Sequence, residues 1–196
     1  GPFHLHGEQL TLIRAAIDGV EVTPRKVADG ITCAVPDGPF TWEAEVEIAP
    51  ETNTALEGLY MSRGMYSTQC EAEGFRKITY YPDRPDVMAP FTVRIEGDQP
   101  VLLSNGNPVA SGAGWAEWHD PWPKPAYLFA LVAGDLTPHR DSFTTLSGRH
   151  VDLAVWGRAG DEGKCAFAMD ALKRSMAWDE RVYGREYDLD VFNIVA

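Results

Sequence analysis

The stretch TWEAEVEIA, residues 41–49, alternates strictly between apolar and polar side chains. Its polar side consists of one threonine and three glutamates, and its apolar side consists of Trp42, Ala44, Val46 and Ile48. In a β-strand, successive side chains point to opposite faces of the sheet, so a period of two marks a strand. The stretch therefore predicts a strand with one buried face and one face in water.

Short strands and tight turns continue on both sides of this stretch. Before it, Asp18-Gly19 separates two apolar runs within residues 11–24. Because both turn residues favour positive φ, this pair predicts a two-residue hairpin. After it, Asn105-Gly106 has the sequence of a type I′ turn. Strands at such short spacing predict an antiparallel β-sandwich or a curved sheet.

Prolines interrupt one of the later apolar regions. Residues 113–136 contain two apolar runs on either side of Pro121, Pro123 and Pro125. A proline has no backbone N–H to donate to a β-ladder. We therefore expect two strands here, separated by a proline-rich loop.

The last quarter of the chain has a helical pattern. Ser147-Gly148 first predicts one more hairpin. Gly184 then suits the residue after a helix C-terminus. The helix is expected within residues 161–184, and its apolar stripe is formed by Cys165, Met169, Leu172, Met176 and Tyr183.

A final apolar stretch, YDLDVFNIVA at 187–196, predicts a strand. It finishes without a turn or a polar ending, although a buried strand that closes a domain is normally covered by a further segment. We therefore expect the chain to stop inside a second domain.

Composition restricts the class of partner and the compartment. The 196 residues carry a formal net charge of −12, which disfavours nucleic acid and anionic membrane surfaces as partners but is compatible with an amine-bearing ligand. The longest apolar run, YLFALVAG at 127–134, is too short to span a bilayer. The three cysteines are widely spaced and show neither a disulfide framework nor zinc-ligand spacing. We expect reduced thiols and a cytoplasmic protein.

Motifs for catalysis are absent from the sequence. There is no HExxH zinc motif, no GxSxG nucleophile turn, no P-loop and no GxGxxG. The stretch HLHGE at 4–8 contains metal-binding residue types, but we expect this terminus to fray. The sequence thus predicts neither a catalytic residue nor a metal site within these 196 residues.

The segment STQCEAEGFRKITYYPDRPD, residues 67–86, contains the most varied chemistry. On a strand, Gln69 and Glu71 would share one face and could offer oxygen acceptors to a protonated amine. The alternative is that Glu71 and Glu73 form ordinary local ion pairs with Arg76 or Lys77. Farther along, Pro85 suits the first position of a short helix.

Several stretches of the chain resemble the N-terminal part of the bacterial aminopeptidase N family of gluzincin metallopeptidases. The resemblance runs in order along nearly the whole chain, and the segment at 68–87 is its longest and most specific part. The matching stretches are NTALEGLY (53–60), TQCEAEGFRKITYYPDRPDV (68–87), LLSNGN (102–107), DPWPKPAYLFALVAGDL (120–136), SMAWDE (175–180) and YGREYDLDVFNIVA (183–196).

The resemblance implies a specific domain organisation. Residues 1–140 would form a saddle-shaped antiparallel β-sandwich, the N-terminal domain. Residues 141–196 would be the leading hairpin, helix and strand of a thermolysin-like catalytic domain. The GAMEN substrate motif, the HExxH helix and the zinc ligands of the family would follow Ala196. The resemblance therefore implies a zinc aminopeptidase whose metal and catalytic base lie outside this chain, which by itself would be inactive.

The same resemblance assigns a role to the segment at 67–86. In the family, the matching loop reaches the active site, so Gln69 would border the pocket for the first side chain of the substrate. Glu71 would accept the free α-ammonium group of a peptide. The partners implied are a peptide N-terminus and the remaining domains of the same chain. The alternative is a stand-alone β-sandwich binding module without an enzymatic role.

Overall fold

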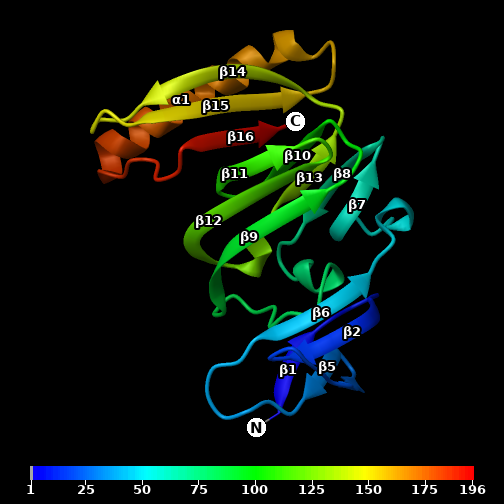
Figure 1. Cartoon of the computed structure of the whole chain (residues 1–196). Helices are drawn as coiled ribbons and strands as arrows, with labels where there is room; N and C mark the ends of the chain where they lie inside the picture. The colour runs from blue at the N-terminus through cyan, green and yellow to red at the C-terminus, as the bar shows by residue number, and fades with distance from the viewer. Residues whose placement is uncertain (1) are drawn as a thin grey trace. The chain divides into compact units, whose positions relative to one another are not determined.

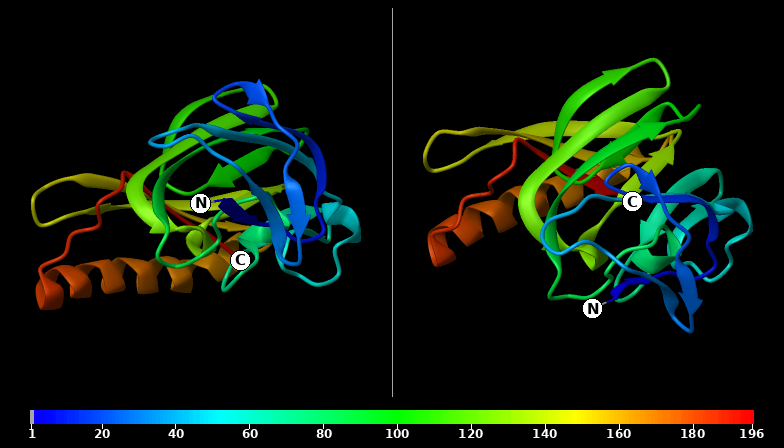
Figure 2. Two further views of the ribbon diagram at one scale, coloured as in Figure 1. Left: turned by 90° about the horizontal axis from the view of Figure 1, so that it is seen from below. Right: turned by 60° about the horizontal axis from the view of Figure 1, so that its bottom comes forward.

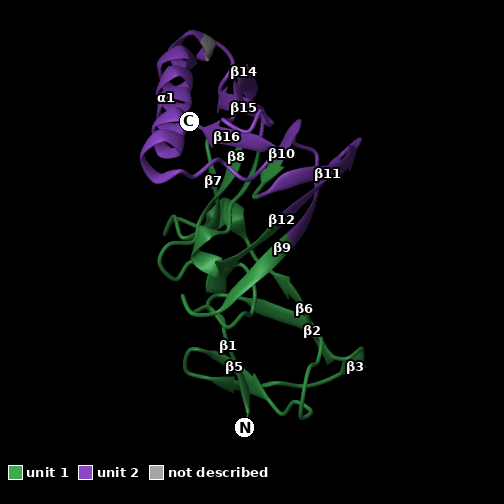
Figure 3. Ribbon diagram, turned by 90° about the vertical axis from the view of Figure 1, so that its left-hand side faces the viewer, with its two compact units in different colours: residues 1–91, 103–105, 121–133 green, residues 92–102, 106–120, 134–196 purple. Residues whose placement is uncertain are grey.

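The structure is a computed structural model that describes residues 2–196, except for the side chain of Glu162. The chain divides into two compact units (Figure 3). Unit 1 comprises residues 1–91, 103–105 and 121–133. Unit 2 comprises residues 92–102, 106–120 and 134–196. These two units do not test the domain limits that the resemblance implies, 1–140 and 141–196, which stay a prediction.

Two three-stranded antiparallel sheets come from the N-terminal part of unit 1 (Figure 1). The first has the order β1-β5-β4, with β1 (Phe3–His6), β5 (Gly30–Cys33) and β4 (Arg25–Val27). The second has the order β3-β2-β6, with β3 (Val20–Glu21), β2 (Thr11–Ile17) and β6 (Trp42–Glu47).

Strand β6 confirms the prediction made from the alternating stretch. Its apolar residues Trp42 and Val46 pack against a small core of Leu5, Ile31 and Tyr80. A core of this kind removes apolar surface from water at about 25 cal/mol per Å². The alternation of apolar and polar residues in the sequence therefore correctly predicts which face of this sheet is buried.

The Asp18-Gly19 hairpin is also confirmed. Asp18 has φ 51° and Gly19 has φ 77°, so both turn residues lie in the left-handed region. Ile17 pairs directly with Val20 across the turn. This is the geometry expected of a two-residue type I′ hairpin.

The stretch at 4–8 does not fray, contrary to the prediction. All four residues of β1 pair with β5, from Phe3 opposite Cys33 to His6 opposite Gly30. Leu5 is fully buried, and the backbone of His6 also bridges to Tyr81. Burial of one leucine and pairing on two sides hold this short strand in place.

Two further sheets complete the β-structure before residue 137, together with the 3₁₀ turns η1 (Pro50–Thr52), η2 (Phe75–Lys77) and η3 (Ala126–Leu128). One sheet has the order β10-β13-β8-β7, with β10 (Val101–Ser104), β13 (Leu131–Gly134), β8 (Met65–Gln69) and β7 (Gly58–Ser62). The other has the order β11-β12-β9, with β11 (Asn107–Gly112), β12 (Trp115–Pro125) and β9 (Met88–Glu96).

The predicted proline-rich loop is wrong, because β12 continues through all three prolines. Its pairing with β11 ends at His119, before Pro121, while β9 is its other neighbour in the sheet. Prolines at alternate positions place their missing N–H groups on the same edge of the strand. Pro121, Pro123 and Pro125 all lie beyond the end of the ladder with β11, so none of them interrupts that pairing.

The predicted type I′ turn at Asn105-Gly106 is also wrong. Gly106 has φ 85°, but Asn105 does not have the positive φ that such a turn requires. Asn105 instead donates its amide to the Leu128 carbonyl at 3.0 Å and accepts the Ala130 N–H at 2.6 Å. Asn105, between β10 and β11, is therefore held to the backbone of residues 128–130 by tertiary hydrogen bonds.

Unit 2 ends in a β–α–β arrangement, with β14 (Thr137–Thr144), β15 (His150–Gly157), η4 (Glu162–Lys164), α1 (Cys165–Tyr183) and β16 (Val191–Val195). Strand β15 pairs antiparallel with β14 through the predicted hairpin and parallel with β16. Both views of Figure 2 show α1 along one face of these strands. The predicted hairpin, helix and strand are thus confirmed as elements.

The apolar stripe of α1 is confirmed, except at its last position. Cys165, Met169, Leu172 and Met176 are buried against Val151, Leu153 and Val155 of β15. Among residues 2–196, none of the helices combines the length and the apolar character needed to cross a bilayer.

Tyr183, the last predicted member of the stripe, is 64% exposed and lies edge-on to Trp178. The buried residue in the final turns is Glu180, whose carboxylate accepts the Leu146 N–H at 3.2 Å. The helix then ends at Gly184, which adopts the predicted left-handed conformation with φ 63°. The end of α1 therefore packs on the β14–β15 connection through a polar contact.

Candidate functional site

The segment that follows β8 exposes the two residues singled out in the sequence. Strand β8 ends at Gln69, which lies opposite Gly58 of β7. Gln69 and Glu71 are exposed, whereas Cys70 between them is buried. The side chains of residues 69–71 thus alternate between exposed and buried as expected, although Glu71 lies in a turn and not on a strand. The amide of Gln69 donates to the Glu71 backbone carbonyl at 3.1 Å, which ties the two residues together.

The turn around Glu71 depends on a glycine. The Gly74 N–H donates to the Cys70 carbonyl at 2.8 Å and closes the turn. A Cβ on Gly74 would lie 2.2 Å from the Gln69 carbonyl oxygen, far inside van der Waals contact. Only glycine allows this close approach of backbone to backbone. The position of Glu71 is therefore set by the chain on both sides of the turn.

The inner side of the turn is apolar. Cys70 and Phe75 are buried together with Ala126, and the Phe75 ring lies 5.1 Å from both the Tyr81 and Phe129 rings. Burial, with a smaller contribution from the nearby Asp83 carboxylate, raises the pKa of Cys70 to about 12. The Cys70 thiol stays protonated at neutral pH, which excludes it as a nucleophile.

A buried ion pair joins the middle of the segment to its later part. The backbone N–H and the Nε of Arg76 each donate to the Asp83 carboxylate at 3.1 Å, and the Arg76 Nη2 donates to the Asp83 carbonyl at 3.1 Å. The side chains of Asp83 and Arg76 are 3% and 14% exposed. We call this pair the Arg76–Asp83 clamp. Sequence reasoning missed it, because two residues seven positions apart on irregular backbone follow no periodic pattern.

The chain immediately after the clamp also departs from the prediction. Pro85 does not begin a short helix; the chain turns there, and β9 starts at Met88. Arg84 and Asp86 form an exposed ion pair beside the turn. The helix prediction was based on Pro85 alone and could not include this local pairing.

The cations near Glu71 are paired with other carboxylates. Arg76 contacts Glu73 at 3.3 Å in addition to Asp83. Lys77 contacts Glu57 at 2.5 Å and Glu8 at 3.4 Å. Within residues 2–196, no ion pair involves Glu71. The direct neutralisation by Arg76 or Lys77 that the alternative requires is thus not observed, and Glu71 presents its negative charge to solvent.

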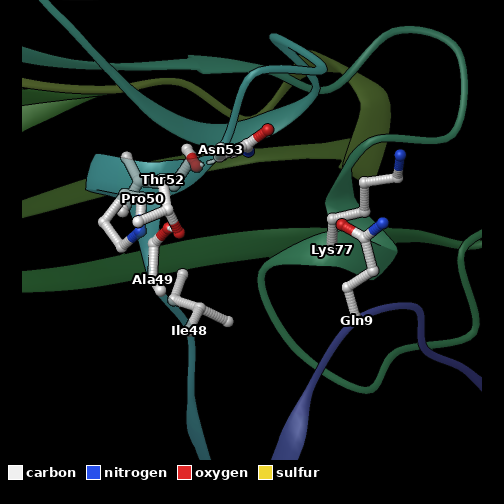
Figure 4. A pocket seen from close by; sticks show the side chains of 8 residues that line it. Gln9, Ile48, Ala49, Pro50, Thr52, Asn53 and Lys77 are labelled. Carbon is white, nitrogen blue, oxygen red and sulfur yellow. Dashed lines mark hydrogen bonds between the residues drawn. The ribbon is translucent and has the colours of Figure 1, made fainter.

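A hollow of about 200 Å³ lies near this segment (Figure 4). Lys77 and Gln9 lie on one side of it, and Pro50 and Asn53 on the other. The Glu57 carboxylate balances the charge of the Lys77 ammonium, and the hydrogen bond between them raises the pKa of Lys77. Asn53 uses its amide N–H groups on two backbone carbonyls at 2.8 and 2.9 Å. The Lys77 charge and the Asn53 amide donors at this hollow are therefore already used within the protein.

Comparison with known proteins identifies relatives of this chain. Residues 14–128 match the family model described as the Peptidase M1 N-terminal domain. The chain is 55% identical over 205 aligned residues to aminopeptidase N of Caulobacter vibrioides, which covers 100% of this chain and 24% of that protein. It is 50% identical over 205 aligned residues to aminopeptidase N of Escherichia coli, covering 100% of this chain and 23% of that protein.

A solved structure shows the same arrangement of elements. Legionella pneumophila aminopeptidase A, solved in complex with aspartic acid, matches with a TM-score of 0.92 and 34% identity. The match covers 99% of this chain and 24% of that one. The chain thus spans about a quarter of the length of the relatives that it matches.

Proposed function

Because the chain belongs to the Peptidase M1 N-terminal domain family, we propose that it supplies the amine-recognition surface of a metallo-aminopeptidase. In this proposal, Glu71 accepts the α-ammonium group of a peptide substrate. Gln69 borders the site of the first side chain. The peptide N-terminus and the remaining domains of the same longer protein are the partners of the chain.

The single observation that supports this role is the charge of Glu71. Its carboxylate is exposed on a turn that Gly74 and the Arg76–Asp83 clamp fix in place, and the neighbouring cations are paired with other acids. A carboxylate that lacks an internal cation can pair with a cation from outside. An exopeptidase must select the chain terminus, and a fixed negative charge does so because internal peptide bonds carry no ammonium group.

Zinc and the chemistry of hydrolysis are proposed to lie elsewhere in the longer protein. The 196 residues contain no HExxH motif, so we assign no ligand of the catalytic zinc and no step of hydrolysis to this chain. We propose that residues 1–140 are the N-terminal domain and that 141–196 begin the catalytic domain. The parallel β15-α1-β16 arrangement supports this second part, since a β–α–β unit commonly opens an α/β domain. A cytoplasmic location remains part of the proposal.

The decisive experiment replaces Glu71 by glutamine in the full-length enzyme that contains this chain. A hydrogen bond to a charged group contributes about 1.5–3 kcal/mol, so kcat/KM for peptides with a free N-terminus should fall by roughly 10- to 100-fold. Zinc content should not change. The matched control is Glu73→Gln, which alters a carboxylate two residues away that already pairs with Arg76.

Equal kcat/KM in Glu71→Gln and wild type would remove Glu71 from substrate binding. The chain would then contribute to the longer protein without amine recognition by Glu71. A second measurement uses the 196-residue chain alone. Incubated with zinc, the chain should release no detectable product from amino-acid amides. Release by the pure chain would contradict the proposal that zinc binding and hydrolysis belong to the rest of the longer protein.

A further inference from the structure

Two histidines and an aspartate meet at the N-terminal edge of unit 1, away from the segment at 67–86 in sequence. His4 and His6 are two residues apart on β1 and so share one face of the strand. Asp29 lies in the turn between β4 and β5, and its carbonyl accepts the Gly7 N–H at 3.1 Å. The strand pairing of β1 with β5 therefore fixes the three side chains on one small surface.

The spacing of these side chains matches that of metal ligands. The His4 Nε2 lies 3.4 Å from the Asp29 Oδ1, and the two imidazole rings are 4.9 Å apart. One ligand atom from each of the three residues lies within 4.8 Å of the others. Two ligands at about 2.0–2.1 Å from a tetrahedral zinc ion are roughly 3.4 Å apart. The His4–Asp29 distance already has this value.

The His4 Nε2 atom gives a second, independent indication. It is enclosed by protein and has no hydrogen-bond partner within the described residues. The His4 Nε2 therefore lies within ion-pair distance of Asp29, at 3.4 Å, but the geometry is not that of a hydrogen bond. A buried polar atom that lacks a partner is unfavourable, and a metal ion between the two atoms would satisfy both lone pairs.

His6 is the weaker of the two imidazole ligands. Its Nδ1 accepts the Asp83 N–H at 3.2 Å, which places the ring proton on Nε2 in the neutral form. The same N–H has a nearer acceptor, the Tyr81 carbonyl at 2.8 Å. Binding a metal through Nε2 requires the His6 proton to move to Nδ1 and the longer of these two contacts to be given up.

We propose that His4, His6 and Asp29 form a binding site for a divalent transition-metal ion, with Zn²⁺ as the ion tested. Two imidazoles and one carboxylate suit zinc and disfavour magnesium, which prefers oxygen ligands. His4 and Asp29 are the main ligands, His6 is the third, and water completes the coordination. This site is independent of the proposed aminopeptidase function. It would link β1 to the β4–β5 turn and stabilise this edge of unit 1.

The test is isothermal titration calorimetry of the 196-residue chain with Zn²⁺ and, separately, with Mg²⁺. We expect about one Zn²⁺ bound per chain and no measurable Mg²⁺ binding. His4→Gln and Asp29→Asn should each weaken Zn²⁺ binding at least ~10-fold, in line with the loss of a metal ligand. His6→Gln should weaken it less. Absence of Zn²⁺ binding, or unchanged affinity in His4→Gln, would overturn the proposal.

The chain contains a matched control for a chance histidine–carboxylate pair. The His150 Nε2 lies 3.0 Å from the Asp152 Oδ1 on β15, an exposed pair that belongs to no three-residue group among the residues described. His150→Gln should leave Zn²⁺ affinity unchanged, and a loss equal to that of His4→Gln would mean non-specific binding. Circular dichroism checks that each variant folds.

A measurement on the wild-type chain keeps the proposal testable if a variant fails to fold. In NMR spectra of the histidine rings, Zn²⁺ should shift the signals of His4 and His6 at lower concentration than those of His150. Simultaneous shifts of all three would contradict a defined site.

Discussion

The turn that carries Glu71 and the β15-α1-β16 unit are held in place by different interactions. In the β–α–β unit, an apolar stripe from Cys165 to Met176 packs on a regular strand. In the turn, the backbone is irregular, and its position is set by one glycine and the Arg76–Asp83 clamp. The first region depends on many similar contacts, whereas the second depends on a few that differ in kind.

The two regions also differ in how their carboxylates are used. Glu180 on α1 is buried and accepts the Leu146 N–H, and Glu186 accepts two hydrogen bonds from Ser147 at 2.8 and 2.6 Å. The hydrogen bonds from Ser147 lower the pKa of Glu186. Glu71 receives neither a cation nor a side-chain donor within the described residues. The comparison indicates that Glu180 and Glu186 serve the fold, whereas Glu71 in the irregular region is available to an external ligand.

Removing the clamp should have the largest effect on stability. In Asp83→Ala, the Arg76 side chain, which is only 14% exposed in the intact pair, would lose its buried partner. Breaking a buried pair from one side costs about 3–5 kcal/mol. We expect a loss of this size in the free energy of unfolding, measured by urea denaturation with tryptophan fluorescence.

The neighbouring pair Arg84–Asp86 provides the control for this experiment. It has the same residue types in the same segment, but its side chains are 60% and 64% exposed. Exposed pairs contribute at most about 1 kcal/mol, so Asp86→Ala should be close to wild type. If Asp83→Ala were equally mild, the clamp would not fix the turn, and the proposed difference between the two regions would be lost.

A smaller effect is expected at the end of α1, in the regular region. Gly184 has φ 63°, and a side chain in the left-handed conformation costs about 1 kcal/mol. Gly184→Ala should therefore destabilise the chain by about this amount in the same urea experiment. The control is Gly163→Ala, because nothing lies within 4 Å of a Cβ at Gly163. A Gly184→Ala variant as stable as wild type would show that the helix end tolerates another conformation.

Elements with a regular sequence pattern were largely predictable. The alternation around Trp42, the Asp18-Gly19 hairpin and the helix after Asp161 each repeat a local pattern that fixes the buried face. The errors fall where a tertiary partner decides the conformation. Asn105 bonds to the backbone of residues 128–130, and Pro121 follows the end of the ladder between β11 and β12. No local pattern contains these partners.

The candidate site was predictable only in part, for the same reason. The exposure of Gln69 and Glu71 around a buried Cys70 follows from alternation. The pairing of Arg76 with Asp83 does not, since Glu73 and Glu71 are nearer in sequence and also carry carboxylates. The role of Glu71 in substrate binding stays a prediction that the kinetic experiment on Glu71→Gln tests.

The smallest expected effect concerns the inner side of the turn and its dependence on pH. Burial first, and the Asp83 carboxylate second, raise the pKa of Cys70 from 9.0 to about 12. Below pH 9 the folded and unfolded chains both keep this proton. Between pH 9 and 12 the unfolded thiol ionises while the folded one does not, so stability falls as pH rises.

For this group alone, the free energy of unfolding should decrease by about 0.8 kcal/mol between pH 8 and pH 9.5. Other groups also titrate in this range, so the measured quantity is the difference between wild type and Cys70→Ala. That variant should lose less stability on going to pH 9.5. The half-buried Cys33, whose pKa burial also raises, gives the comparison. Cys33→Ala and Cys70→Ala could instead reduce the pH dependence of the free energy of unfolding by the same amount. In that case the packing of Phe75 would not shield Cys70 from solvent, and the turn would be more open than its contacts indicate.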